Sequence, residues 1–216
     1  MNQSLAWSDE QWAKVRAAVH DSAMNARCAG SFLPLYGPLS DDVQSVPRQR
    51  LDLHELDYGG ATALGLAVDD VDTLRFCTAA INLRLGSAQV SDPDLESALL
   101  MFRRAADIVA RVEDAIVFNG QPARDSVPVQ GLRGVPPIYT LSGGQTNAGL
   151  LTAGEHSVAI AKPKSGGSGE GVFAAVVEGI TRLESSGHFG PFACVLGESL
   201  FLAVNTPLPN SMVLPR

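Results

Sequence analysis

The chain has 216 residues, of which 45% are hydrophobic, and a formal net charge of -7 at pH 7. This hydrophobic content is enough to bury a substantial core, so we expect a globular protein of one large or two small domains. The acidic balance disfavours wholesale binding to nucleic acid, because nonspecific affinity for phosphate backbones comes mainly from a surplus of Lys and Arg.

Signals for secretion or membrane insertion are not found. The polar start MNQSLAWSDE has no basic-then-apolar pattern, and Gly and Pro interrupt the uncharged stretches before they reach the roughly 20 apolar residues of a membrane span. The three cysteines form no CxxC pair, which disfavours a disulfide framework or a zinc knuckle. These features predict a cytoplasmic protein.

The first predicted helix begins with a set of capping signals. Ser8 is placed as the cap, Gln11 closes an S-x-x-Q capping box, and Trp7 precedes the cap at a position from which it packs on Trp12. The helix is predicted to end near Gly30. Its narrow apolar stripe repeats at helical spacing and consists of Trp12, Val15, Val19 and Ala23.

The segment between residues 32 and 90 carries no long helical period. Residues 50–56 alternate apolar and polar side chains as a strand with one buried face does, and residues 58–61 predict a turn to a second strand. Little in such a hairpin forms a core of its own. We therefore expect an arm that extends from the body toward neighbouring molecules.

The strongest helical signal follows, with Asp92 as cap, Pro93 in the first turn and Gly120 at the end. We expect this helix, over residues 93–119, to be the spine of the fold. Its apolar face consists of Leu95, Leu99, Phe102, Ala106, Val109, Val112 and Ile116.

The region 131–171 is rich in Gly, Pro, Ser and Thr and predicts loops, with an exposed one at 162–169. A turn at 185–187 and a strand at 192–196 are expected near the end of the chain. This order of elements indicates an α+β fold without regular βαβ alternation. A third helix is predicted before the turn from the spacing of Val172, Val176, Ile180 and Leu183.

Several motifs resemble catalytic signatures but are better explained by local structure. Residues 141–145 read LSGGQ, as in ABC ATPases, yet the G-x-x-x-x-G-K-[ST] loop such domains need does not occur, so we interpret them as a turn. The lysine at 164 precedes the glycines, which indicates a flexible loop and not a phosphate cradle. Ser199 is predicted to cap a helix, because Phe201 replaces the second glycine of a G-x-S-x-G elbow.

The titratable residues give no catalytic constellation. Glu113 and Asp114 point about 100° apart on a helix, so ion pairing or a packed polar contact is favoured over joint acid–base work. No nucleophile, base and orienting group come together, and we expect no catalytic site, no cofactor and no metal. The histidines lie in separate segments without metal-ligand spacing: His20, His54, His156 and His188.

Taken in order, these segments resemble the encapsulins, bacterial and archaeal nanocompartment shells that share the major-capsid fold of tailed phages (Hong Kong phage type). A D/E-x-Q-W helix precedes a Tyr-Gly-Pro segment and a β arm. The spine helix closes in Ala-x-x-x-Glu-Asp-x-x-x-Phe-x-Gly, and a Gly-hydrophobic joint and a segment similar to G-P-[YF]-x-L-V follow. The matching stretches are residues 36–38, 110–120, 131–132 and 187–196.

The resemblance implies an N-terminal helix and connector over 1–42, an extended arm over 43–68, a peripheral domain with its spine helix over 69–130, and an axial domain over 131–216. It also implies icosahedral self-assembly of many copies around a cargo enzyme, commonly a peroxidase or a ferritin-like protein, with pores for small solutes. Family members continue beyond the part matched here through further strands, and the loop 134–171 is longer than the family predicts.

Two sites follow from the resemblance by position. The stripe Trp12, Val15 and Val19 would dock the terminal apolar peptide of a cargo enzyme, with packing on the spine helix as the alternative. The second site is a loop around the five-fold pore, in which the carboxylate would favour cations and the imidazole could respond to pH. The alternative interpretation of this loop is an ordinary surface turn. The loop consists of Glu184, Ser185, Ser186, Gly187 and His188.

Two other functions stay open at this point. A phage or prophage major capsid protein that packages DNA shares the fold, and a strongly basic inner face would support it, whereas the net charge counts against it. A nucleotide-binding enzyme that uses the Gly-rich region 141–171 is disfavoured by the missing phosphate-loop lysine motif.

Overall fold

The computed structural model describes residues 7–40, 42–58, 61–121, 135–154, 156–160 and 169–206. The chain divides into two compact units, Met1–Ala153 and Gly154–Arg216. The predicted boundary between peripheral and axial domains at 130/131, the glycine joint at 131–132 and most of the loop at 162–169 lie outside the described residues. The domain division therefore stays a prediction.

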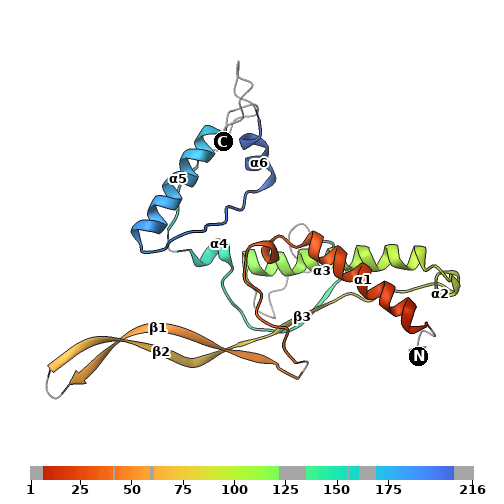
Figure 1. Cartoon of the computed structure of the whole chain (residues 1–216), viewed down its shortest axis with the longest axis horizontal. Coiled ribbons are helices and arrows are strands. Elements are labelled where there is room, and N and C mark those ends of the chain that lie inside the picture. Colours follow the sequence, from red (N-terminus) through yellow and green to blue (C-terminus); the bar gives the residue numbers. More distant parts are fainter. Residues whose placement is uncertain are drawn as a thin grey trace. The chain divides into compact units, whose positions relative to one another are not determined.

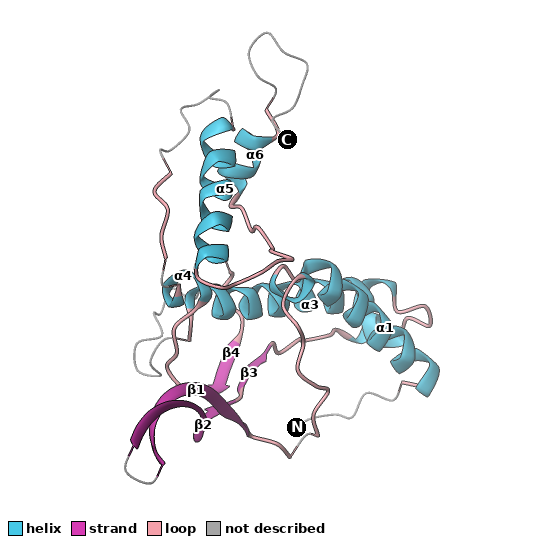
Figure 2. Ribbon diagram, turned by 60° about the vertical axis from the view of Figure 1, so that its left-hand side comes forward, coloured by secondary structure: helices cyan, strands magenta, loops and turns pink. Residues whose placement is uncertain are grey.

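Two long helices lie side by side in the first unit (Figures 1 and 2). Helix α1 spans Asp9–Ala26 and helix α3 spans Glu96–Asn119. Burial of each large apolar side chain between them contributes about 1.5–3 kcal/mol, which holds α1 on α3. The buried residues are Trp7, Val15, Leu95 and Ala98, with Trp12, Val19, Leu85, Leu99 and Phe102 packed against them.

The start of α1 confirms the predicted capping signals. The Gln11 backbone N–H donates to Ser8 Oγ at 3.2 Å, and the Ser8 backbone N–H donates to Gln11 Oε1 at 3.0 Å. The rings of Trp7 and Trp12 lie 5.0 Å apart, and Trp7 Nε1 donates to the Val90 carbonyl at 3.0 Å. The helix ends at Ala26, before the predicted residue 30, and the 3-10 helix η1 follows at Ala29–Ser31.

Helix α3 begins at Glu96 and not at the predicted residue 93. The short helix α2, Ser87–Ser91, ends just before Asp92, whose carboxylate accepts from the backbone N–H of Asp94 and of Glu96, both at 3.0 Å. Asp92 thus closes a turn ahead of the helix. Leu95 takes a left-handed conformation at φ 57°, and its complete burial compensates for that cost. Gly120 ends the helix, as predicted.

The predicted hairpin is present as two long antiparallel strands, β1 (Ser45–Tyr58) and β2 (Ala61–Arg75) (Figure 1). The ladder continues beyond residue 68, where the arm was expected to end, and closes with Ser45 opposite Arg75. Leu66 and Val68, on one face of β2, are 74% and 56% exposed. The two glycines of the predicted turn lie outside the described residues.

A small antiparallel sheet packs on the second half of α3 and consists of β3 (Cys77–Ala80) and β4 (Thr140–Gly143). Strand β4 and the short helix α4 (Leu150–Ala153) lie within the region expected to be loop, so that expectation was wrong there. For β4 the reason is packing, because apolar side chains at and before this strand complete a cluster formed by Ile108, Val112, Val135, Ala79, Ile81, Ala115, Ile116, Tyr139 and Leu141.

The end of α3 passes so close to a second backbone segment that no side chain fits. Gly120 has φ +84°, and a Cβ on it would lie 2.2 Å from the Asn147 carbonyl oxygen. Gly120→Ala is expected to lower the free energy of unfolding by about 2–3 kcal/mol, measured by urea denaturation. Gly86→Ala is the control, because its Cβ would meet nothing closer than 3.5 Å, and an equal loss there would contradict the prediction.

The second unit contains α5 (Glu170–Ser185) and α6 (Glu198–Val204). The predicted helix and the turn after it are confirmed, with Gly187 at φ 85°. Val172 is buried, and Val176 and Ile180 are half-buried on one face of α5.

Two predictions in this unit were wrong. Residues 192–196 form no strand, since no partner strand lies beside them among the described residues and an unpaired strand leaves its backbone N–H and C=O groups unsatisfied. The cap of α6 is Gly197 and not Ser199, because the Gly197 carbonyl accepts from the Leu200 and Phe201 backbone N–H groups at 3.0 and 2.9 Å.

No helix in the described part of the chain combines the length and the apolarity that crossing a membrane requires.

Candidate functional site

The face of α1 that packs on α3 also borders a groove between the two helices, here called the docking groove, with a volume of about 400 Å³. It contains the whole stripe that the resemblance assigned to cargo docking. Val15 is only 4% exposed and packs on α3, whereas Trp12 and Val19 are half-buried and contact the core from its edge. The stripe therefore both packs on the spine helix α3 and lines the groove. The groove is lined by Trp12, Val15, Arg16, Val19, His20, Ala23, Met24, Arg27 and Phe102.

The docking groove has an apolar floor and a polar rim. Met24 is 47% exposed and Phe102 is half-buried, so apolar surface of both helices is open to an occupant. Arg16 and His20 are exposed and follow Trp12 at successive four-residue steps, which places the three side chains along one side of the helix. The groove thus suits an apolar segment whose edges are polar.

The end of α1 is fastened to α3 by the two carboxylates that sequence analysis had assigned to polar contacts. Asp114 accepts from the backbone N–H of Cys28 and of Ala29, each at 2.8 Å. Arg27 Nε lies 2.8 Å from Glu113 Oε2 as an ion pair, although the buried N–H is not aligned for a hydrogen bond. The predicted structural role is confirmed, and we call the Asp114 contacts the carboxylate clamp.

The five residues assigned to the pore loop lie together at the end of α5 and are all exposed. Their backbone forms a tight turn, in which the Gly187 N–H donates to the Glu184 carbonyl at 3.0 Å and the His188 N–H donates to the Leu183 carbonyl at 2.9 Å. The pore role of this turn stays a prediction.

The turn is held by a segment that sequence analysis missed. His156 Nε2 lies 3.0 Å from Ser186 Oγ, and Arg182 Nη1 donates to the Ser157 carbonyl at 3.1 Å. Nothing in the spacing predicted these contacts, because the residues are separated by some 25–30 positions. Arg16 and His20 were detectable, since they share the helical spacing of Trp12.

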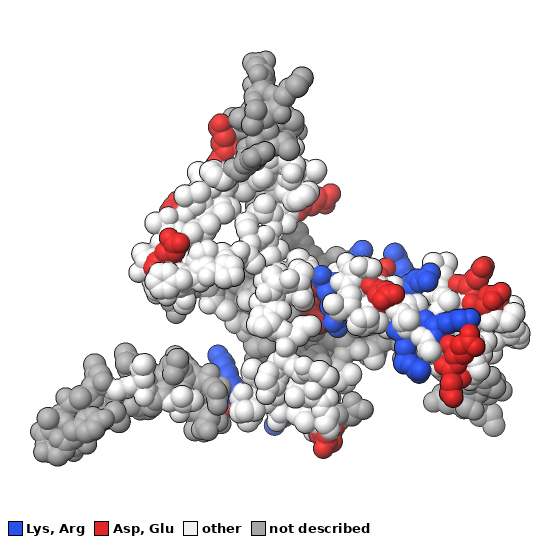
Figure 3. Space-filling model, in the orientation of Figure 1, with Lys and Arg blue, Asp and Glu red and all other residues white. Residues whose placement is uncertain are grey.

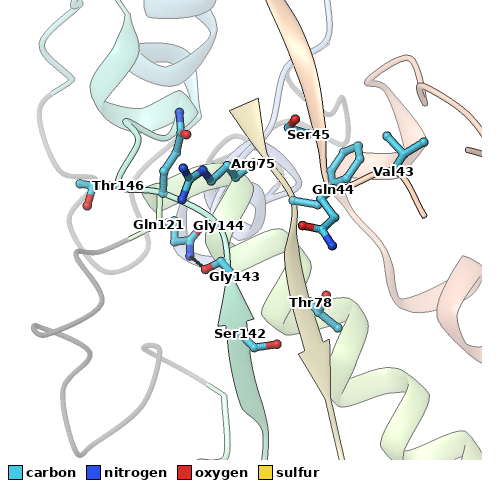
Figure 4. A pocket seen from close by; sticks show the side chains of 12 residues that line it. Val43, Gln44, Ser45, Arg75, Thr78, Gln121, Ser142, Gly143, Gly144 and Thr146 are labelled. Carbon is cyan, nitrogen blue, oxygen red and sulfur yellow. Dashed lines mark hydrogen bonds between the residues drawn. The ribbon is translucent and has the colours of Figure 1, made fainter. Parts of the chain in front are cut away.

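A larger pocket of about 750 Å³ lies at the base of the hairpin arm, beside β3 and β4 (Figure 4). Its charged side chain is Arg75, and Gln121 Nε2 donates across its edge to the Gly143 carbonyl at 3.2 Å. The remaining lining residues are Val43, Gln44, Ser45, Phe76, Thr78, Ser142, Gly144, Gln145 and Thr146. Amides and hydroxyls of this kind bind polar groups but do not act as acid–base catalysts at neutral pH.

The LSGGQ segment borders this pocket without forming a phosphate cradle. Gly143 pairs with Cys77 in the sheet, and the Gly144 backbone N–H donates to the Phe76 carbonyl at 2.8 Å, so it is not free for a nucleotide. The turn predicted over 141–145 was wrong for residues 141–143, which belong to β4, and Gly143 and Gly144 have positive φ angles at the end of that strand. Burial raises the pKa of the nearby Cys77 thiol, which favours its protonated form.

Known proteins similar to this chain are shell proteins. A diheme-cytochrome–encapsulin shell fusion protein of Kuenenia stuttgartiensis is 29% identical over 201 residues, which cover 89% of this chain and 48% of that protein. A type 1 encapsulin shell protein of Myxococcus xanthus is 27% identical over 205 residues, which cover 89% of this chain and 62% of that protein. No protein-family model matches the chain.

These relatives imply the major-capsid fold of tailed phages, and the mixture of helix and sheet in the structure agrees with that class. The resemblance to encapsulin shell proteins is confirmed, because the homology to two of them extends over nearly nine-tenths of the chain. A phage capsid protein is not favoured. The chain spans about half to three-fifths of the length of the curated relatives it matches.

Proposed function

We propose that this chain is a noncatalytic subunit of an encapsulin-type shell, which self-assembles in the cytoplasm around a cargo enzyme. The homology to two shell proteins supports the proposal, and the observation that carries it is the hairpin arm. Its strands pair along almost their whole length, yet Leu66 and Val68 stay exposed. Apolar side chains on an extended arm gain burial only against another molecule.

The proposed cargo is an enzyme that carries a terminal apolar peptide, with peroxidases and ferritin-like proteins as the expected classes. The docking groove supports this role, because its floor offers apolar surface of both α1 and α3 to an extended segment. Icosahedral assembly would bring copies of the turn at 184–188 around a pore for small solutes. The exposure of Glu184 and His188 is compatible with such a lining.

Negative-stain electron microscopy of the purified protein, together with its native mass, tests the proposal. Uniform hollow particles are expected, both without cargo and after coexpression with an enzyme that carries a docking peptide. If the mass shows an intact chain and the protein still stays monomeric or forms only small oligomers, the proposed shell function is wrong.

A further inference from the structure

We propose that residues 156–157 form a strap that holds the turn at 184–188 in one conformation, and that the strap thereby restricts the passage of solutes at this turn. The first half concerns the second unit by itself. The second half rests on the pore role in the proposed function and adds the residues that regulate it. The strap lies in the region 134–171, which is longer than the resemblance predicts, so the inference also gives part of that extra length a role.

The strap meets the end of α5 at two places. His156 Nε2 lies 3.0 Å from Ser186 Oγ, and Arg182 Nη1 donates to the Ser157 carbonyl at 3.1 Å. Both contacts lie within the second compact unit, Gly154–Arg216. A single contact would leave the strap free to pivot, whereas two contacts at adjacent residues fix its direction as well as its position. The strap and the end of α5 are therefore expected to move together.

The hydroxyl that the strap contacts is itself part of the turn. Ser186 Oγ donates to the Arg182 carbonyl at 3.0 Å. A hydroxyl carries one hydrogen, so His156 Nε2 is the donor in its contact with Ser186. The neutral ring with its hydrogen on Nε2 and the imidazolium both donate from this atom. The strap contact thus persists whichever charge His156 carries, and it is not a pH switch.

Arg182 supplies the second attachment and is oriented by an ion pair. Its Nη2 lies 2.6 Å from Glu178 Oε1, while Nη1 reaches Ser157. A planar guanidinium serves two acceptors in fixed directions, so the pair with Glu178 aims Arg182 at the strap. In Figure 3, Lys and Arg side chains gather over α1 and α3, whereas the second unit shows acidic ones. Among the described residues of that unit, Arg182 is the only Lys or Arg.

The turn depends on the strap because it has few other restraints. Its five residues are all exposed, and its internal backbone bonds join neighbours in sequence, such as Gly187 to Glu184 and His188 to Leu183. In the described part of the chain, no further hydrogen bond reaches 182–188 from a distant segment. Exposed segments with few buried contacts open locally at little cost in free energy. Loss of one strap contact is therefore expected to raise the open population about 2- to 10-fold.

Hydrogen–deuterium exchange of the purified protein, followed by mass spectrometry of peptides over 183–190, tests the strap. The backbone N–H groups of Ser186, Gly187 and His188 donate within the turn and so report its opening. His156→Ala is expected to speed their exchange about 2- to 10-fold. His156→Gln is expected to restore slow exchange, because a glutamine amide can donate to the same hydroxyl. Unchanged exchange in His156→Ala would overturn the strap, whatever the protein assembles into.

Two further variants assign the effect to the two attachments. Ser157→Ala is the matched control, because the strap uses the Ser157 backbone carbonyl, which alanine keeps, and exchange is expected to stay slow. Arg182→Lys keeps the charge but loses the planar fork, and is expected to speed exchange by a factor similar to that of His156→Ala. If Ser157→Ala speeds exchange as much as His156→Ala, any change in this segment loosens the turn and the two contacts are not its cause.

The consequence for solutes is measured on particles that enclose a fluorescent protein. The rate at which cupric ion quenches the enclosed fluorescence reports passage through the shell. His156→Ala is expected to speed quenching about twofold or more relative to Ser157→Ala. If exchange at the turn rises while quenching is unchanged, the strap holds the turn but solutes do not pass there. The pore role in the proposed function is then wrong, and the second half of the inference with it.

Discussion

Replacement of Asp114 by alanine is expected to lower the free energy of unfolding of the first unit by about 2–3 kcal/mol. The carboxylate clamp satisfies two backbone N–H groups at once, those of Cys28 and Ala29, at 2.8 Å each. Ala29 is only 4% exposed, so water cannot fully replace the lost acceptor at that amide. Urea denaturation followed by tryptophan fluorescence reports the change, because Trp7 and Trp12 lie at the start of the helix that the clamp fastens.

Two matched variants make the Asp114 prediction specific. Asp114→Asn keeps one side-chain acceptor and is expected to lose about half as much stability. Glu113→Gln removes only a partly exposed ion pair with Arg27 and is expected to cost about 0–1 kcal/mol. All variants are compared at one protein concentration and in the same oligomeric state. If Glu113→Gln costs as much as Asp114→Ala, the backbone contacts are not what fastens α1.

Introduction of aspartate at both Leu66 and Val68 is expected to abolish particle assembly and leave the folded subunit intact. Both side chains are largely exposed, at 74% and 56%, so the substitutions bury no charge within the subunit. In an assembled shell the same positions would place carboxylates against an apolar neighbour, where desolvation of a charge is costly. Size-exclusion chromatography with light scattering measures the particle fraction, and circular dichroism checks the fold.

Thr73→Asp is the control for the arm, because Thr73 is also exposed on β2 but offers little apolar surface. Particles are expected to form in this variant as in the unaltered protein. A double Leu66→Asp and Val68→Asp variant that still assembles fully would show that these two side chains are not at a subunit contact.

Local signals in the sequence predicted local structure well. The capping box at Ser8 and Gln11, the hairpin and the end of α3 at Gly120 follow from interactions between residues near in sequence, and all are confirmed. Asp92 was also recognised as a capping residue, but the start of α3 was placed too early. Burial of Leu95 between two helices, which fixes that start, is a tertiary effect that a capping pattern does not contain.

The candidate site could not be predicted from local sequence patterns, because it depends on contacts between residues far apart in the chain. The docking groove depends on Phe102 lying beside α1, and the clamp depends on Asp114 meeting backbone N–H groups more than 80 positions away. At 192–196 a local signal predicted a strand that does not form. The apolar run has β propensity, but no partner strand lies beside it among the described residues. The polar pocket at Arg75 combines segments far apart in the chain, and no sequence signal indicated it.

Helix α1 is fixed at both of its ends, by the Trp7 contact to Val90 at one and by the carboxylate clamp at the other. In the proposed docking of a cargo peptide, one wall of the groove is therefore already in place, and the loss of conformational freedom on binding would fall on the peptide. Affinity then depends on how ordered that segment is beforehand. A docking tag stiffened by proline outside its apolar core would occupy the groove more tightly than an equally apolar tag in a glycine-rich tail.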